Sequence, residues 1–142
     1  MDTNQVIFEI KALSLPIDQY VTVGGAALAV RAFRHTDDID LVVTPPLFER
    51  LKSEGWVQKS RHNGRLGLKR GRVEVYLEVN AQRFARDTDW LIAHSELVEG
   101  IPLADLNTLL GWKRAYGRDK DASDVELLEK VIREKTGAHS VA

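Results

Sequence analysis

Residues 21–43 read VTVGGAALAVRAFRHTDDIDLVV, and this stretch decides the fold class. A short β-rich run from Tyr20 to Val23 ends at Gly24-Gly25, where two residues without a Cβ permit a tight turn. The small apolar residues from Ala26 to Phe33 suit a short buried helix, and a second strand is expected from Asp38 to Thr44. This order of strand, glycine turn, helix and strand predicts helices packed on a sheet.

The segments on either side extend the same plan. Before the stretch, apolar residues at helical spacing predict a helix that Pro16 closes. After it, Pro45-Pro46 can open a helix that stops at Gly55, and residues 56–59 suit a short strand.

A hairpin is predicted in the middle of the chain. Its strands run from Arg65 to Lys69 and from Val73 to Val79, and Arg70-Gly71-Arg72 forms the turn. Successive side chains of a strand point to opposite faces, so the second strand has one apolar and one polar face. The apolar face, expected to meet the core, comprises Val73, Val75, Leu77 and Val79, and the polar face comprises Glu74, Tyr76 and Glu78.

The last third of the chain is expected to form two helices. One runs from Leu103 to Tyr116 and breaks at Gly117, and the other runs from Asp121 to about Glu134 and ends by Gly137. The prediction is therefore a single α/β (α+β) domain over residues 1–142. It comprises a mixed sheet of four or five strands packed with helices, and a C-terminal helical pair.

The composition excludes several classes of protein. The 142 residues include 20 basic and 21 acidic ones, a balance that argues against a nucleic-acid coat or a polybasic membrane binder. There is no cysteine, so disulfides and thiolate metal sites are ruled out. No apolar run approaches the roughly 20 residues of a membrane helix, and the N-terminal residues do not resemble a secretory signal. A cytoplasmic protein is expected.

Asp38 and Asp40 are the leading candidates for chemistry. Residues two apart on a strand face the same way, so two like charges would repel each other unless a cation lies between them. Carboxylate oxygens suit Mg²⁺, with Mn²⁺ as the alternative ion. The glycine turn at Gly24-Gly25 precedes this pair by about a dozen residues, and a turn that opens a helix can hold a phosphate. A phosphate cradle beside a metal pair suits phosphoryl or nucleotidyl transfer.

The stretch resembles the signature of the DNA-polymerase-beta-like nucleotidyltransferase superfamily. It is most similar to the small bacterial branch of minimal, toxin–antitoxin-associated members, in which a Gly-Gly pair precedes Arg-x-Thr-x-Asp-Ile-Asp-Leu. Those positions are Arg34, Thr36, Asp38, Ile39, Asp40 and Leu41. A second block typical of that branch, a leucine-rich helix followed by a lysine and Arg-x-Lys/Arg-Asp-x-x-Asp, matches Leu109, Leu110, Lys113, Arg118, Lys120, Asp121 and Asp124.

The resemblance implies a role for each matched residue. Asp38 and Asp40 would be catalytic and hold the metal, with Glu74 as the third acid and Glu78 as the runner-up for that position. The nucleotide would be bound by Gly24, Gly25, Arg34, Thr36 and Lys113.

Structural alternatives remain open for several of these residues. Thr36 could simply hydrogen-bond its own turn, and Arg34 could pair with Asp37. Lys113 could offset the dipole of its helix, and Asp121 and Asp124 are favoured as members of an ion-pair network between the last two helices.

Other residues are interpreted as structural. The hairpin cations Lys69, Arg70 and Arg72 suit a solvated turn slightly better than a basic rim near Glu74. The histidines His35, His62 and His94 lack partners at zinc-ligand spacing, and Trp56, Trp90 and Trp112 suit core or boundary positions.

The functional hypothesis is a metal-dependent nucleotidyltransferase. It would move a nucleoside monophosphate from a nucleoside triphosphate to a hydroxyl on a protein, an RNA such as tRNA, or a small molecule. The alternative is a catalytically quiet domain of the same fold that acts as a binding or antitoxin-like partner of another protein. A metal-dependent phosphohydrolase is a third hypothesis. No membrane partner is expected under any of the three hypotheses.

Overall fold

The computed structural model describes residues 1–60, 64–81 and 83–140, with side chains as far as residue 136. Contacts within the chain divide it into two compact units. Unit 1 comprises Met1–Val79 and Arg86–Ala104, and unit 2 comprises Asn80–Ala85 and Asp105–Ala142. The single domain expected from the sequence stays a prediction.

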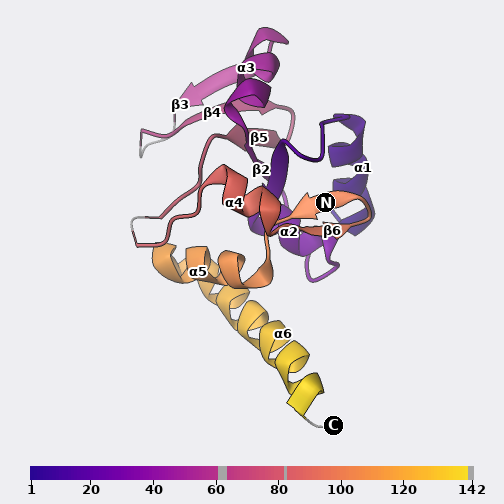
Figure 1. The fold of residues 1–142 in the computed structure, drawn as a ribbon, viewed down its shortest axis with the longest axis vertical. Helices are drawn as coiled ribbons and strands as arrows, with labels where there is room; N and C mark the ends of the chain where they lie inside the picture. The colour runs from indigo at the N-terminus through magenta and orange to yellow at the C-terminus, as the bar shows by residue number, and fades with distance from the viewer. Residues whose placement is uncertain (61–63, 82, 141–142) are drawn as a thin grey trace. The chain divides into compact units, whose positions relative to one another are not determined.

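Unit 1 contains one mixed sheet. Its strands are β1 (Tyr20–Val23), β2 (Ile39–Val43), β3 (Val57–Ser60), β4 (Leu66–Arg70), β5 (Val73–Tyr76), β6 (Glu96–Val98) and β7 (Ile101–Leu103). They lie in the order β3-β4-β5-β2-β1-β7-β6. Figure 1 labels β3, β4, β5 and β2 in succession along this sheet. The β1–β7 and β2–β5 pairs are parallel, and the other four pairs are antiparallel.

The described part of the chain thus has seven strands, and the expected four or five were too few. The two unexpected strands, β6 and β7, have three residues each, which is too short for an alternating pattern to be recognised. Glu99 and Gly100 join them with positive φ angles of 53° and 77°, as in the tight turn of a two-residue hairpin. Leu103, expected in a helix, belongs to β7 and pairs with Thr22.

The helices of unit 1 are α1 (Thr3–Ala12), α2 (Gly24–Val30), α3 (Pro45–Ser53) and α4 (Thr88–Ala93). Three of them begin at a side-chain cap, in which an oxygen accepts a backbone N–H that the first helical turn leaves without a partner. The caps are Asp2 for α1, Thr44 for α3 and Asp87 for α4. In contrast, α2 follows Val23 with no side-chain cap, so the chain passes directly from β1 through the glycine turn into the helix.

One face of the sheet carries the hydrophobic core. Ile39, Leu41 and Val43 of β2 lie on this face, together with Val73 and Val75 of β5. Residues of α1, α2 and α3 pack against them. Helices α1 and α3 each have one apolar side, and α2 is apolar all round and buried from Ala26 to Val30. The opposite face of β2 carries Asp40, whose side chain therefore points away from this core.

Several expected boundaries differ from the observed ones. Helix α2 occupies Gly24–Val30 instead of Ala26 to Phe33, and Ala32, with φ of 64°, lies beyond its end. Strand β5 ends at Tyr76 and not at Val79, so Leu77 is exposed and does not join the core. Tyr76 is buried, although its position in the alternating pattern placed it on the polar face.

Unit 2 contains the C-terminal helical pair, as expected. Its elements are α5 (Leu106–Tyr116), the 3-10 turn η1 (Asp119–Asp121) and α6 (Ala122–Ser140). Helix α5 begins after a cap at Asp105 and ends at Gly117, whose φ of 58° is left-handed. Gly137 does not end α6, which continues to Ser140, because a glycine inside a helix costs only about 1 kcal/mol. Across the described ranges, no helix is long and apolar enough to cross a membrane.

Candidate active site

Asp40 occupies the centre of the sheet and has a defined partner on each side. In the register of β1 and β2 it lies opposite Val23, and in the register of β2 and β5 it lies opposite Glu74. Directly opposed residues of neighbouring strands point to the same face, and their Cβ atoms lie about 5 Å apart. The third acid expected from the sequence is therefore the cross-strand neighbour of Asp40.

The glycine turn lies against this acid. Gly24 follows Val23 directly, and a Cβ at Gly24 would lie 3.5 Å from Oδ2 of Asp40. The φ of Gly24 is +61°, which residues with a side chain rarely adopt. The turn therefore brings backbone, and no side chain, to the carboxylate of Asp40.

Gly25 also lies very close to neighbouring side chains. A Cβ there would lie 2.6 Å from Oγ1 of Thr36 and 2.9 Å from Nη2 of Arg34, so no side chain fits without a shift. Arg34 also donates a 2.7 Å hydrogen bond to the carbonyl oxygen of His35. The folded chain thus gathers four of the expected site residues, Gly24, Gly25, Arg34 and Thr36, around the loop before β2.

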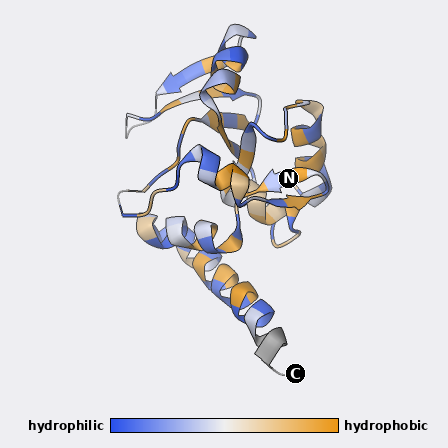
Figure 2. Cartoon of the chain, viewed as in Figure 1, coloured by the Kyte–Doolittle hydropathy of each residue, from blue (hydrophilic) through white to orange (hydrophobic). Residues whose placement is uncertain are grey.

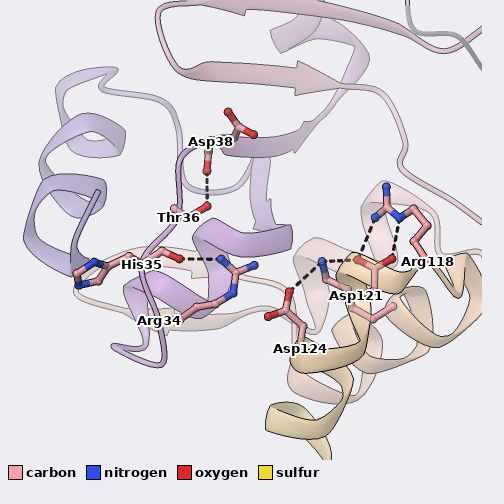
Figure 3. Close-up of polar contacts among 8 residues, drawn as sticks. Arg34, His35, Thr36, Asp38, Arg118, Asp121 and Asp124 are labelled. Carbon is pink, nitrogen blue, oxygen red and sulfur yellow. Dashed lines mark hydrogen bonds and ion pairs between the residues drawn. The ribbon is translucent and has the colours of Figure 1, made fainter.

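Hydrogen bonds hold this loop in place. The Thr36 hydroxyl donates to the carbonyl oxygen of Asp38 at 3.0 Å (Figure 3), so Thr36 does bond within its own turn. The Thr36 amide donates to the carbonyl of Met1, and the Ile39 amide donates to the carbonyl of Arg72. Asp38 is exposed and precedes β2 by one residue, whereas the strand was expected to begin at Asp38. The expectation that both aspartates lie on one strand was therefore wrong: Asp40 pairs with the neighbouring strands, and Asp38 belongs to the loop before β2.

Tyr76 and Lys69 contact the carboxylate of Glu74. The Tyr76 hydroxyl donates a hydrogen bond to Oε2, and Nζ of Lys69 lies 3.7 Å from Oε1. The Tyr76 ring needs the glycine opposite it, because a Cβ at Gly67 would lie 2.8 Å from Cε1 of the ring. Sequence reasoning missed Tyr76 and Gly67, and their signal was the pairing of an aromatic residue with a glycine across two strands.

Glu78, the runner-up for the third acid, lies beyond the end of β5. Its Oε1 accepts a 3.1 Å hydrogen bond from Nε of Arg65, and its side chain is nearly half exposed. Glu74 is therefore the acid that the sheet places beside Asp40. Among the residues that the structure describes, no group of three His, Asp or Glu side chains is close enough to hold a metal ion.

The second sequence block forms an ion-pair network within unit 2 (Figure 3). Nζ of Lys113 lies 3.2 Å from Oδ1 of Asp121 and 3.2 Å from Oδ2 of Asp124, and Nε of Arg118 lies 2.7 Å from Oδ2 of Asp121. Burial by itself would raise the pKa of Asp121, but hydrogen bonds from Arg118 and Lys113 outweigh burial and lower it. The structural role favoured for these two acids is confirmed, and the role of Lys113 toward a nucleotide stays a prediction.

The three tryptophans occupy core or boundary positions, as expected. Trp56 and Trp112 are buried, as expected of core residues, and Trp90 stacks on His94 with ring centroids 3.9 Å apart. His35 is an exposed loop residue. His62 lies outside the described residues.

Neither a protein-family model nor a curated protein sequence matches the chain. Solved structures do. A candidate nucleotidyltransferase from Thermotoga maritima, TM1012, is 18% identical, with a TM-score of 0.55 over 94% of this chain and 96% of that one. The antibiotic-resistance factor ANT(2'')-Ia is 17% identical, with a TM-score of 0.51 over 99% of this chain and 97% of that one. The chain therefore has a nucleotidyltransferase-like fold, as expected.

Proposed function

We propose that this protein is a metal-dependent nucleotidyltransferase that moves a nucleoside monophosphate from a nucleoside triphosphate to an acceptor hydroxyl. The observation that carries the proposal is the position of Asp40. This residue lies between the Gly24 turn on one side and Glu74 on the other, at the centre of a sheet with a nucleotidyltransferase-like fold.

The carboxylates of Asp38 and Asp40 fit a divalent metal ion. Both are hard oxygen donors, and Mg²⁺ commonly binds one or two carboxylates and takes its remaining ligands from water and substrate phosphates. Asp38 is exposed and Asp40 is half-buried, so an ion can reach both from solvent. When bound, Mg²⁺ or Mn²⁺ would neutralise the charge that develops on the phosphate oxygens.

The glycine turn supports a role in holding the phosphates. Backbone N–H groups at the start of α2 have no side-chain cap, and the lack of a Cβ at Gly24 and Gly25 lets an anion approach them closely. The Arg34 guanidinium beside Gly25 adds positive charge to the same place.

Glu74 would serve the acceptor. Its carboxylate would take the proton of the acceptor hydroxyl as the acceptor oxygen bonds to the α-phosphorus. The bond from the α-phosphorus to the bridging oxygen breaks at the same time, and pyrophosphate leaves. Tyr76 and Lys69 would position Glu74 for this step, since both contact its carboxylate.

Titration calorimetry with each nucleoside triphosphate, with and without Mg²⁺, tests the proposal. Wild-type protein should bind at least one triphosphate only when Mg²⁺ is present, and the double variant Asp38→Asn, Asp40→Asn should lose that binding. Asp18→Asn, an exposed aspartate in the loop before β1, is the matched control. Absence of metal-dependent binding by the wild type would support the catalytically quiet partner protein instead. Release of phosphate and not pyrophosphate during turnover would indicate a phosphohydrolase.

A further inference from the structure

An open pocket of about 490 Å³ lies where β3 begins and β4 ends. Neither Gly24 nor Gly25 lines it. Its lining comprises Gly55, Val57, Lys59, Lys69, Arg70 and Gly71. Every charged residue that the structure describes in this lining is a cation. The strand β3 beside it is exposed along its whole length and is drawn mostly in the hydrophilic colour (Figure 2). We refer to these six residues as the hairpin pocket.

The two glycines of the hairpin pocket leave open space beside it. Gly55 and Gly71 have φ angles of +93° and +59°, and a Cβ at either would have nothing within 4 Å. The space beside both glycines is therefore open, and the Gly55 amide donates to the carbonyl oxygen of Lys52 at 3.2 Å. Arg70 is held in place, because its guanidinium lies over the Trp56 ring at 5.2 Å and donates to the carbonyl of Glu54 at 2.8 Å. Lys59 and Arg70 are exposed and Lys69 is half-exposed, and three cations beside open space suit an anionic ligand.

The register of the sheet connects the hairpin pocket to the acid site. Val57 lies opposite Lys69, Lys69 lies opposite Glu74, and Glu74 lies opposite Asp40. Side chains of directly opposed residues share a face, so these four form one row across the sheet. Strands are about 4.8 Å apart, which places Lys69 about 10 Å from Asp40 and Val57 about 14 Å from it.

We propose that the hairpin pocket binds backbone phosphates of a nucleic-acid strand whose end carries the acceptor hydroxyl. The inference rests on the proposed function, which places the hydroxyl near Asp40 and Glu74. Stacked nucleotides rise about 3.4 Å each, so a distance of 10–14 Å corresponds to about three or four nucleotides from that end. Val57, whose side chain is 60% exposed within the pocket, adds apolar surface for a base.

Lys69 couples the two sites. Its ammonium group lies 3.7 Å from Glu74 and also lines the hairpin pocket. A bound phosphate therefore competes with Glu74 for the same cation. Binding of the strand loosens the hold of Lys69 on the Glu74 carboxylate at the moment when that carboxylate is needed as a base.

Fluorescence anisotropy with a labelled single-stranded RNA of about 12 nucleotides, and with DNA of the same sequence, tests the pocket; known sites for single strands span about 4–16 nucleotides. Wild-type affinity should fall as salt rises. For each lysine that contacts a phosphate, the slope of log affinity against log salt should decrease by about 0.7 when that lysine is replaced. We expect this decrease for Lys59→Gln and again for Lys69→Gln. Lys52→Gln, an exposed lysine of α3 outside the pocket, should leave the slope unchanged.

Three results would overturn the inference. The first is wild-type protein that binds nucleoside triphosphate but neither strand. The second is an unchanged slope in both pocket variants. The third is a polyglutamate peptide that binds as tightly as RNA, which would point to an acidic protein partner. Calorimetry of triphosphate binding separates these results from failure of the proposed function. If strands bind and no triphosphate binds, the acceptor role is wrong.

Discussion

Each compact unit contains a pair of aspartates that are close together in the sequence, and the two pairs differ in how deeply they are buried. Asp121 and Asp124 of unit 2 are 1% and 4% exposed, and Lys113 forms an ion pair with each of them. In unit 1, Asp38 lies in the loop just before the central strand β2 and is exposed, and Asp40 lies in that strand and is half-buried. The two pairs, spaced two and three residues apart, therefore differ in burial and in their ion-pair partners.

This difference in burial explains why the two acid pairs have different roles. A carboxylate removed from water needs a cation of its own chain, since a buried charge without a partner is costly. Unit 2 supplies that cation from α5 and the turn after it, and the result is a structural network. The pair in unit 1 keeps its access to solvent, so a cation from solution can reach it. One pair stabilises the fold, and we propose that the other binds a metal ion.

The largest effect is expected for Asp40→Asn in unit 1. Loss of a metal-binding carboxylate should weaken metal-dependent triphosphate binding by at least a hundredfold, since even residues that only support metal ligands contribute about 10- to 100-fold. The free energy of unfolding should change less than for Asp121→Asn, because Asp40 is half-buried and Asp121 is buried. Calorimetry and urea unfolding measure the two quantities. Unchanged binding would remove the distinction between the two pairs.

In unit 2, Asp121→Asn should instead lower the free energy of unfolding. Loss of its charged hydrogen bonds to Lys113 and Arg118 should cost about 2 kcal/mol of stability at neutral pH. The lowered pKa of Asp121 contributes stability that is present above its ordinary value of 3.8 and is lost as pH falls through the folded-state value. The deficit of the variant should therefore shrink in acid. Urea unfolding at several pH values measures it, and Asp119→Asn, an exposed neighbour, should show no such deficit.

Gly25→Ala tests how tightly the loop before β2 is packed. The new Cβ would meet Thr36 and Arg34, and overpacking of this kind costs about 1–2 kcal/mol. Adding Thr36→Ala removes the closest contact, so the double variant should recover part of the loss. Thermal unfolding of the four proteins in this cycle gives the coupling between the two positions. Purely additive effects would show that the contact is absent in solution.

The smallest expected effect is the loss of stability at high pH that comes from Tyr20, whose buried side chain is uncharged at neutral pH. Burial raises the pKa of Tyr20 to about 12 from 10.0, the reverse of the direction at Asp121. A raised pKa contributes stability that is complete below pH 10 and is lost as pH rises toward 12. At pH 11 the loss should be about 1 kcal/mol. Comparison of wild type with Tyr20→Phe by urea unfolding at pH 8 and pH 11 isolates this loss, and an equal pH dependence of both proteins would contradict it.

Local patterns predicted much of unit 1. The run of β1, the glycine turn and β2 was predicted to within a few residues, because strong β-formers alternate there with small residues and helix-opening prolines. The hairpin β6–β7 was not predicted. Its strands have three residues each, and Leu103 was instead assigned to the helix that follows. Gly137 was expected to end a helix but lies inside one, because a single unfavourable residue does not decide the end of α6.

The sequence by itself determined the elements on which the candidate site is built and the acids Asp38 and Asp40, because turn and strand preferences act over a few residues. Tertiary structure alone decided that Glu74 lies beside Asp40 and that Tyr76 and Lys69 contact it. It also decided which acid pair is buried. These properties depend on strand register and on contacts between residues far apart in the chain, and no local preference specifies them.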